Sequence, residues 1–132
     1  MSAAADPRYH YRCRLVDVID GDTVDLEVDL GFHARLLIRA RLAGINAPER
    51  KARDARERDL ALAATMHVAD WCEARADRLI VRTDKDGRDK FGRLLATLID
   101  QADGATVQAS LMAAGLAVPY DGQTARRPWG NA

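Results

Sequence analysis

Residues 23–30 alternate strictly between apolar and polar side chains, and this pattern most limits what the chain can fold into. A two-residue period places alternate side chains on opposite faces of a β-strand, so one face is buried and the other, mostly acidic, faces water. Residues 9–19 and 33–45 have a similar β-like pattern. Turn residues at Asp20–Asp22 and at Gly31 separate the three runs. We therefore predict an antiparallel three-stranded meander.

The rest of the chain predicts two helices and two further strands. Asp54 and Glu57 form a capping-box pattern at the start of the first helix. Apolar residues then recur at helical spacing and mark the buried face of a helix of about 20 residues: Leu60, Ala64, Val68 and Trp71. Strands are predicted at residues 79–81 and 93–99, and a short helix at residues 107–114.

The order strand-strand-strand-helix-strand-strand is typical of a small five-stranded Greek-key barrel, the OB-fold. We therefore predict an α+β protein, mainly β, with one long helix between the third and fourth strands and a short helix after the fifth. A length of 132 residues fits one domain. The expected division is a flexible N-terminus over residues 1–8, a folded domain over residues 9–120 and an irregular tail over residues 121–132.

Composition narrows the possible classes of protein. Hydrophobic residues make up 48% and charged residues 30%, and no apolar run is long enough to span a bilayer. The start of the chain lacks the apolar segment of a secretory signal, so we expect a cytoplasmic protein, with an exported form as an open alternative. We also expect a monomer. Lys+Arg and Asp+Glu are 20 each, so the net charge is zero. Binding of nucleic acid would therefore depend on locally placed charge.

The cysteines and histidines predict no metal centre. Cys13 and Cys72 lie far apart in the sequence without a metal-ligand pattern, and we expect two buried free thiols, with a disulfide as the alternative. The three histidines are isolated from one another, so no histidine-based metal or catalytic cluster is expected: His10, His33 and His67.

The chain leaves the third predicted strand between Arg41 and Glu49. Pro48 fixes its own φ and pushes Ala47 toward an extended conformation, so the strand must leave the sheet here. Side chains at such an exit are held by a rigid strand and lie at its open end, which suits a reactive site. We interpret this segment as half of a metal-assisted site for cleaving phosphodiesters.

Two earlier arginines on the same strand, Arg35 and Arg39, have a simpler interpretation. They alternate with apolar residues and are expected to be solvated. We expect them to pair across strands with the acidic face of residues 23–30.

Three segments would meet at one end of the predicted barrel. They are Ile-Asp-Gly-Asp-Thr-Val at 19–24, the run from Arg-Leu to Gly-Ile-Asn-Ala-Pro-Glu at 41–49, and Asp-Lys-Phe-Gly-Arg at 89–93. A fourth motif, Gly-Leu-Ala-Val-Pro-Tyr, follows at 115–120. Each motif alone is weak, because turns and strand ends of this kind are common. In this order and spacing, the four motifs closely resemble the staphylococcal nuclease (thermonuclease) family over nearly the whole chain.

The resemblance implies an OB-fold and Ca²⁺-dependent cleavage of DNA and RNA, for which we expect single strands to be the favoured substrate. Carried over position by position, it implies phosphate-binding arginines at Arg41 and Arg93 and a general base at Glu49. It also implies one Ca²⁺ ion, which we expect to be weakly bound, and a pocket for the nucleotide. The implied metal ligands are Asp22, Asn46 and the backbone carbonyl of Ala47, and the implied pocket residues are Asp89, Lys90, Phe91 and Tyr120.

The sequence departs from the family pattern mainly at the metal site. Asn46 stands where the family has an aspartate ligand, and Ala47 stands where a threonine carbonyl binds the metal. An amide oxygen still suits Ca²⁺, but the lost charge should lower the affinity. The alternative function is therefore a catalytically weak or inactive OB module that binds single-stranded nucleic acid or a protein. Retention of both arginines and the glutamate favours the nuclease.

The C-terminal tail carries Arg126, Arg127 and Trp129 in place of the family's last helix. These residues could add phosphate and base-stacking contacts. The alternative is that Trp129 covers the barrel.

Overall fold

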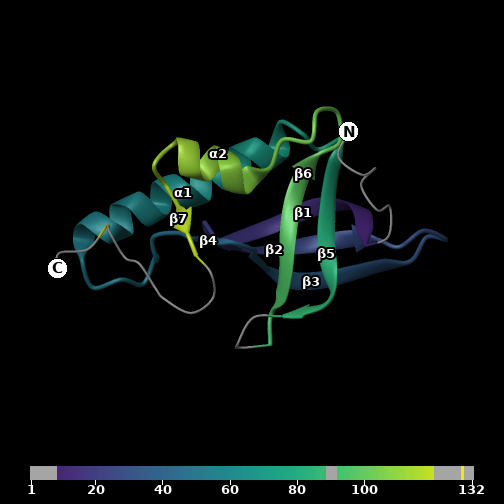
Figure 1. Ribbon diagram of the computed structural model, residues 1–132, viewed down its shortest axis with the longest axis horizontal. Helices are drawn as coiled ribbons and strands as arrows, with labels where there is room; N and C mark the ends of the chain where they lie inside the picture. Colours follow the sequence, from purple (N-terminus) through teal and green to yellow (C-terminus); the bar gives the residue numbers. More distant parts are fainter. Residues whose placement is uncertain (1–8, 89–91, 121–128, 130–132) are drawn as a thin grey trace.

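The computed structural model describes residues 9–88, 92–120 and 129. Within this part of the chain there are seven strands and two helices (Figure 1). In chain order they are β1 (His10–Asp20), β2 (Thr23–Asp29), β3 (Arg35–Leu42), β4 (Ile45–Asn46), α1 (Ala55–Glu73), β5 (Leu79–Arg88), β6 (Leu94–Asp100), α2 (Val107–Ala113) and β7 (Val118–Pro119).

Five of the strands form a closed barrel in the order β1-β2-β3-β6-β5. All neighbours are antiparallel except β3 and β6, which run parallel and pair Ala40–Leu42 with Leu94–Ala96. The barrel and the two helices confirm the predicted α+β architecture. The parallel pairing brings the end of β3 beside the start of β6, with Ala40 paired to Leu94, so Arg93, the residue before β6, lies close to the end of β3.

Both helices lie together on one side of the barrel, whereas the turn between β2 and β3 projects on the other side (Figure 1). Asp54 is the N-cap of α1, and its carboxylate accepts a hydrogen bond from the Arg56 N–H at 2.7 Å. Thr106 caps α2 in the same way through the Ala109 N–H. In the described residues, no helix has the length and apolar character that crossing a membrane requires.

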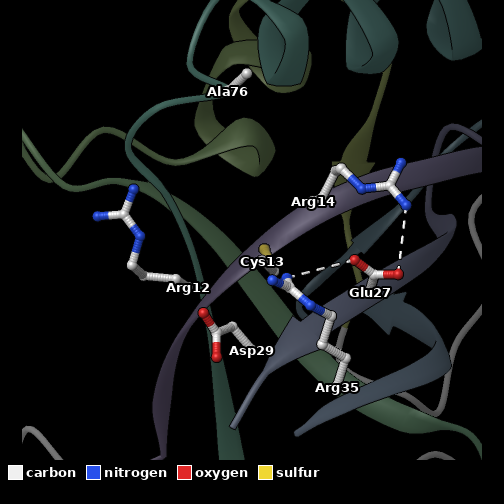
Figure 2. A pocket seen from close by; sticks show the side chains of 7 residues that line it. All are labelled: Arg12, Cys13, Arg14, Glu27, Asp29, Arg35 and Ala76. Carbon is white, nitrogen blue, oxygen red and sulfur yellow. Dashed lines mark hydrogen bonds and ion pairs between the residues drawn. The ribbon is translucent and has the colours of Figure 1, made fainter. Parts of the chain in front are cut away.

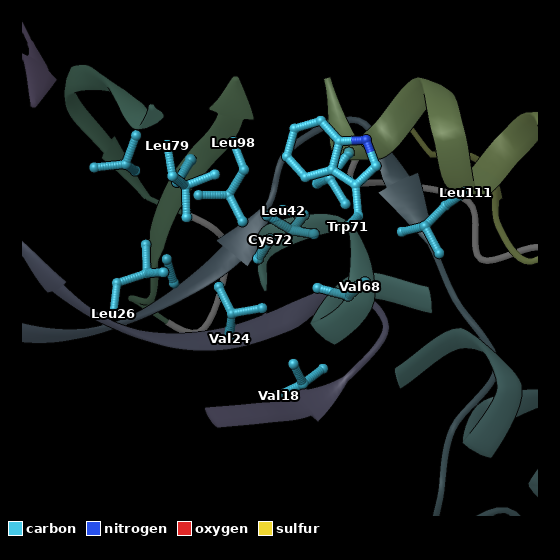
Figure 3. Packing of buried hydrophobic residues seen from close by; sticks show 14 of the residues in the cluster. Val18, Val24, Leu26, Leu42, Val68, Trp71, Cys72, Leu79, Leu98 and Leu111 are labelled. Atoms are coloured by element: carbon cyan, nitrogen blue, oxygen red, sulfur yellow. The ribbon is translucent and has the colours of Figure 1, made fainter. Parts of the chain in front are cut away.

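The core fills the space between the barrel and the helices (Figure 3). Strand residues such as Leu26 and Leu98 and helix residues such as Val68 and Leu111 are fully buried. Cys13 and Cys72 are both buried and free, which confirms the predicted thiols. Burial raises the pKa of each thiol to about 12. Both are therefore protonated and unreactive at neutral pH.

Two predicted boundaries were wrong. The third strand does not run to residue 45, because Gly44 with a φ of +82° turns the chain after Leu42. Ile45–Asn46 then forms a separate strand that pairs with Val118–Pro119. β5 does not end at residue 81 but continues to Arg88, since its backbone resumes pairing with β6 after an irregularity. Charge and glycine in residues 84–88 had suggested a loop.

The outer face of β1–β3 carries ion pairs, as expected for Arg35 and Arg39. Arg39 binds Asp25 through two hydrogen bonds of 2.8 and 3.0 Å. Glu27 lies between two guanidinium groups at 3.4 and 3.6 Å, those of Arg14 and Arg35 (Figure 2).

A hollow of about 110 Å³ lies among these side chains. Cys13, which lines the hollow, lies seven positions along β1 from Asp20 at the β1–β2 turn, or roughly 20 Å. This hollow is therefore separate from the predicted site.

Candidate active site

Three backbone segments meet at the end of β3. Asp22 lies in the turn between β1 and β2, and the next residue, Thr23, pairs with Arg41. The Leu42 N–H donates to the Asp22 carbonyl at 2.7 Å, which ties this turn to the end of β3. Asn46 returns to the same place on β4 after the turn at Gly44. Strand pairing therefore brings together residues that the sequence separates by about 20 positions.

The guanidinium group of Arg41 joins these segments. Its Nη1 lies 3.1 Å from Asp22 Oδ2, and the side chains of both residues are only 9% exposed. Its Nη2 donates to the Ile45 carbonyl at 2.9 Å and to the Asn46 side-chain oxygen. The Tyr120 ring lies against the guanidinium, with 5.2 Å from Cζ to the ring centroid. The predicted phosphate-binding arginine therefore already has four partners within the protein.

Three carboxylates hold the chain immediately after β4. The Ala47 N–H donates to Asp22 at 2.9 Å, the Glu49 N–H to Glu57 at 2.9 Å, and the Arg50 N–H to Asp20 at 3.0 Å. The intervening residue is proline, which has no N–H. Every backbone donor from residue 47 to residue 50 is therefore bound to a carboxylate. This fixes the path of the chain while the Glu49 residue itself stays exposed.

Asp20 shows that several negative charges lie close together here. Burial raises the pKa of Asp20, and the nearby carboxylates of Asp22 and Glu49 raise it further. The Arg50 N–H and guanidinium act in the opposite direction. The carboxylates of Asp20, Asp22 and Glu49 are thus close enough to interact, and the guanidinium groups of Arg41 and Arg50 lie among them.

Gly21 allows the β1–β2 turn to approach the helix. A Cβ atom at this position would lie 2.8 Å from the Ala64 Cβ on α1 and 2.9 Å from the Ala47 Cβ. Both distances are too short for carbon atoms in contact. The glycine between the two aspartates is therefore required by close packing, and it sets how near Asp22 comes to the segment that carries Glu49.

The expected metal ligands fit a hard cation in atom type. Asp22, Asn46 and the Ala47 carbonyl offer carboxylate, amide and peptide oxygens, the donors that Ca²⁺ uses. Within residues 9–88, 92–120 and 129, however, no three Asp, Glu, His or Cys side chains are grouped so that they could hold a metal ion. The Asp22 and Asn46 oxygens accept instead from Arg41. The oxygen atoms that could bind the metal are therefore present, and in this structure two of them bind the Arg41 guanidinium instead.

The structure describes some of the remaining predicted site residues, whereas others lie outside its described part. Tyr120 is held by its N–H, which donates to the Gly44 carbonyl at 2.8 Å, and its ring contacts Arg41. Arg93 is partly buried and immediately precedes β6. Trp129 is 5% exposed, which favours the packing interpretation of the tail. Three predicted pocket residues lie outside the described residues: Asp89, Lys90 and Phe91.

Sequence reasoning missed two carboxylates of the site. Asp20 had been interpreted only as a turn residue, and Glu57 only as part of a capping box. The Asp-Gly-Asp spacing could have indicated that both aspartates face the same segment. No sequence signal could have shown that the Glu57 side chain reaches back to the Glu49 backbone, because that contact depends on where α1 packs.

Comparison with known proteins identifies the family of this chain. The model of the family described as staphylococcal nuclease homologue matches residues 39–128, more than half of the chain. The chain belongs to the staphylococcal nuclease family. A comparison with curated proteins found no match. The matched stretch includes Arg41, Asn46, Glu49 and Arg93. Asp22 precedes the matched stretch and contacts it through the ion pair with Arg41.

Proposed function

We propose that this staphylococcal nuclease homologue hydrolyses phosphodiester bonds of DNA or RNA in a reaction that depends on Ca²⁺. One observation carries the proposal. The β1–β2 turn, the end of β3 and the segment after β4 bring Asp22, Arg41 and Glu49 to one end of the barrel, and Arg93 immediately precedes the adjoining strand β6. Such a combination of guanidinium groups and carboxylates suits an anionic substrate that gains charge in its transition state.

Glu49 acts as the general base. Its residue is exposed, so its carboxylate can meet a water molecule beside a bound phosphate. It accepts a proton as the water oxygen bonds to phosphorus, and the bond from phosphorus to the leaving oxygen breaks. Arg41 and Arg93 bind the phosphate oxygens and stabilise the charge that develops on them. Bound Ca²⁺, held by Asp22, Asn46 and the Ala47 carbonyl, would supply Lewis acidity and lower the pKa of a ligated water.

Arg41 must change partners during this reaction. Its Nη2 donates to the Asn46 amide oxygen, a neutral acceptor, and a phosphate oxygen is a stronger one. The contact with Asp22 is an ion pair between buried groups and is expected to persist until a cation competes for the carboxylate. Asn46 is therefore the contact most easily exchanged for substrate.

A binding module without catalysis is the second candidate. The zero net charge and the neutral Asn46 at the metal position favour it. The two functions differ in the fate of a single-stranded oligonucleotide mixed with the pure protein. The proposed nuclease degrades it at millimolar Ca²⁺ and stops when EDTA is added. An oligonucleotide that is bound but intact after prolonged incubation with Ca²⁺ would leave only the binding module.

A further inference from the structure

The segment that carries Glu49 is held by side chains rather than by a sheet. β4 ends at Asn46 and α1 begins at Ala55, so residues 47–54 form a connection between them. A connection of this length at a surface is usually mobile. Here its first backbone donors bind carboxylates from the end of β1, the β1–β2 turn and α1. The position of Glu49 therefore depends on those carboxylates.

Glu57 differs from the other two carboxylates in its origin, because it comes from a helix and not from the β1–β2 hairpin. It lies in the first turn of α1, and only 4% of the residue is exposed. Its Oε2 accepts the Glu49 N–H at 2.9 Å, eight residues back along the chain. Burying a carboxylate is costly unless it is well hydrogen-bonded. The N-terminal turn of a helix also favours negative charge.

This hydrogen bond acts next to the candidate catalytic group. Glu49 follows the buried Pro48, whose ring restricts the backbone on one side. The bond from the N–H to Glu57 restricts it on the other. With both constraints in place, the position of the Glu49 Cα atom and the direction in which its side chain leaves the backbone are set before substrate binds. Preorganisation of this kind contributes strongly to rate, since a misplacement of about 1 Å can cost about 10²-fold.

We propose that Glu57 is a positioning residue of the active site, which holds the backbone of Glu49 so that its carboxylate faces the scissile phosphate. This inference rests on the proposed nuclease function. Glu57 touches neither substrate nor metal in this role. It acts through the Glu49 N–H, and its capping-box position brings it there because α1 starts close to the strand exit.

Two substitutions of similar size distinguish the effect of losing the hydrogen-bond acceptor from the effect of changing the volume of the side chain. Glu57→Gln keeps an oxygen that can accept the Glu49 N–H, whereas Glu57→Met fills the same space without an acceptor. In the full chain we expect hydrogen exchange of the Glu49 amide to stay slow in the Gln variant and to become at least about tenfold faster in the Met variant. With single-stranded DNA and Ca²⁺, kcat should fall about 10²-fold in the Met variant with little change in KM. The Gln variant should stay within about threefold of the unmodified chain.

Asp100→Asn is the matched control. Asp100 is also buried, at 2% exposed, and it accepts hydrogen bonds from Arg75 and Arg78 away from the site. The Asp100→Asn variant should have a lower free energy of unfolding and an unchanged kcat. The proposal is overturned if Glu57→Met keeps the kcat of the unmodified chain, or if the control loses as much. Should the Met variant fail to fold, fast exchange of the Glu49 amide in the unmodified chain overturns it and slow exchange supports it. An unmodified chain that cleaves nothing refutes the nuclease function itself.

Discussion

Arg41 and Asp22 form an ion pair of 3.1 Å in which both side chains are 91% removed from solvent. The pair connects the end of β3 to the turn between β1 and β2. The same guanidinium reaches Asn46 on β4, so one side chain links three segments of the site. A buried charge that loses its partner is strongly destabilising, and this gives Arg41 a structural role besides its expected contact with phosphate.

Replacing Arg41 should therefore cost stability as well as activity. Arg41→Ala leaves the Asp22 carboxylate buried without its countercharge, and we expect the free energy of unfolding to fall by about 3 kcal/mol or more. Urea unfolding followed by circular dichroism measures this change. Arg39→Ala is the matched control, because Arg39 on the same strand pairs with Asp25 at the exposed surface and should cost far less. Equal losses in the two variants would contradict the structural role of Arg41.

Adding one methyl group at Gly21 should disturb the site through packing alone. A Cβ there would press on the Ala64 and Ala47 Cβ atoms, and we expect Gly21→Ala to cost about 1–3 kcal/mol. Combining it with Ala64→Gly removes one of the two close contacts. The double variant should then lose less stability than the sum of the single variants, as measured by thermal unfolding. Strict additivity would show that the turn does not pack against α1 as described.

The raised pKa of Asp20 predicts a pH-dependent effect on stability. Folding shifts the pKa upward from 3.8, so the folded state binds more protons than the unfolded state between 3.8 and the raised value. The free energy of unfolding therefore falls as pH rises through this window and stays lowered above it. Asp20→Asn keeps an oxygen for the Arg50 N–H and removes the half-buried charge. It should raise the melting temperature at pH 7, with the gain vanishing below pH 3.8.

Restoring a carboxylate at position 46 should strengthen cation binding. In Asn46→Asp the new charge joins that of Asp22, and we expect Ca²⁺ affinity to increase by about tenfold in isothermal titration calorimetry. Gln101→Glu adds the same charge at an exposed position after β6 and serves as the control. It should leave the affinity unchanged. If Asn46→Asp binds Ca²⁺ no more tightly than the unmodified chain, Asn46 does not contribute to the metal site.

The barrel could be predicted because its strands carry a local signal. Alternation in β2 places Val24, Leu26 and Val28 inside, and each is buried in the structure. Helical spacing likewise identified Val68 and Trp71 as the packed face of α1. Periodicity reflects which face is buried, and for these elements the buried face follows from the sequence alone.

The partners within the site could not be predicted in this way. Motifs placed Arg41 and Glu49 at one end of the barrel, but the acceptors of Arg41 depend on the turn at Gly44 that folds Asn46 back beside it. The contact between Glu57 and Glu49 likewise depends on how α1 packs. Both contacts are set by tertiary structure, which short-range patterns do not encode.

The central claim is that Glu49 is the general base of a Ca²⁺-dependent nuclease. Its most direct test is the rate of cleavage of single-stranded DNA in saturating Ca²⁺ by the unmodified chain and by Glu49→Gln, with folding of both verified. We predict cleavage by the unmodified chain and a fall in kcat of about 10²–10³-fold in the variant. Equal cleavage by both proteins, or intact DNA with the unmodified chain, would contradict the claim.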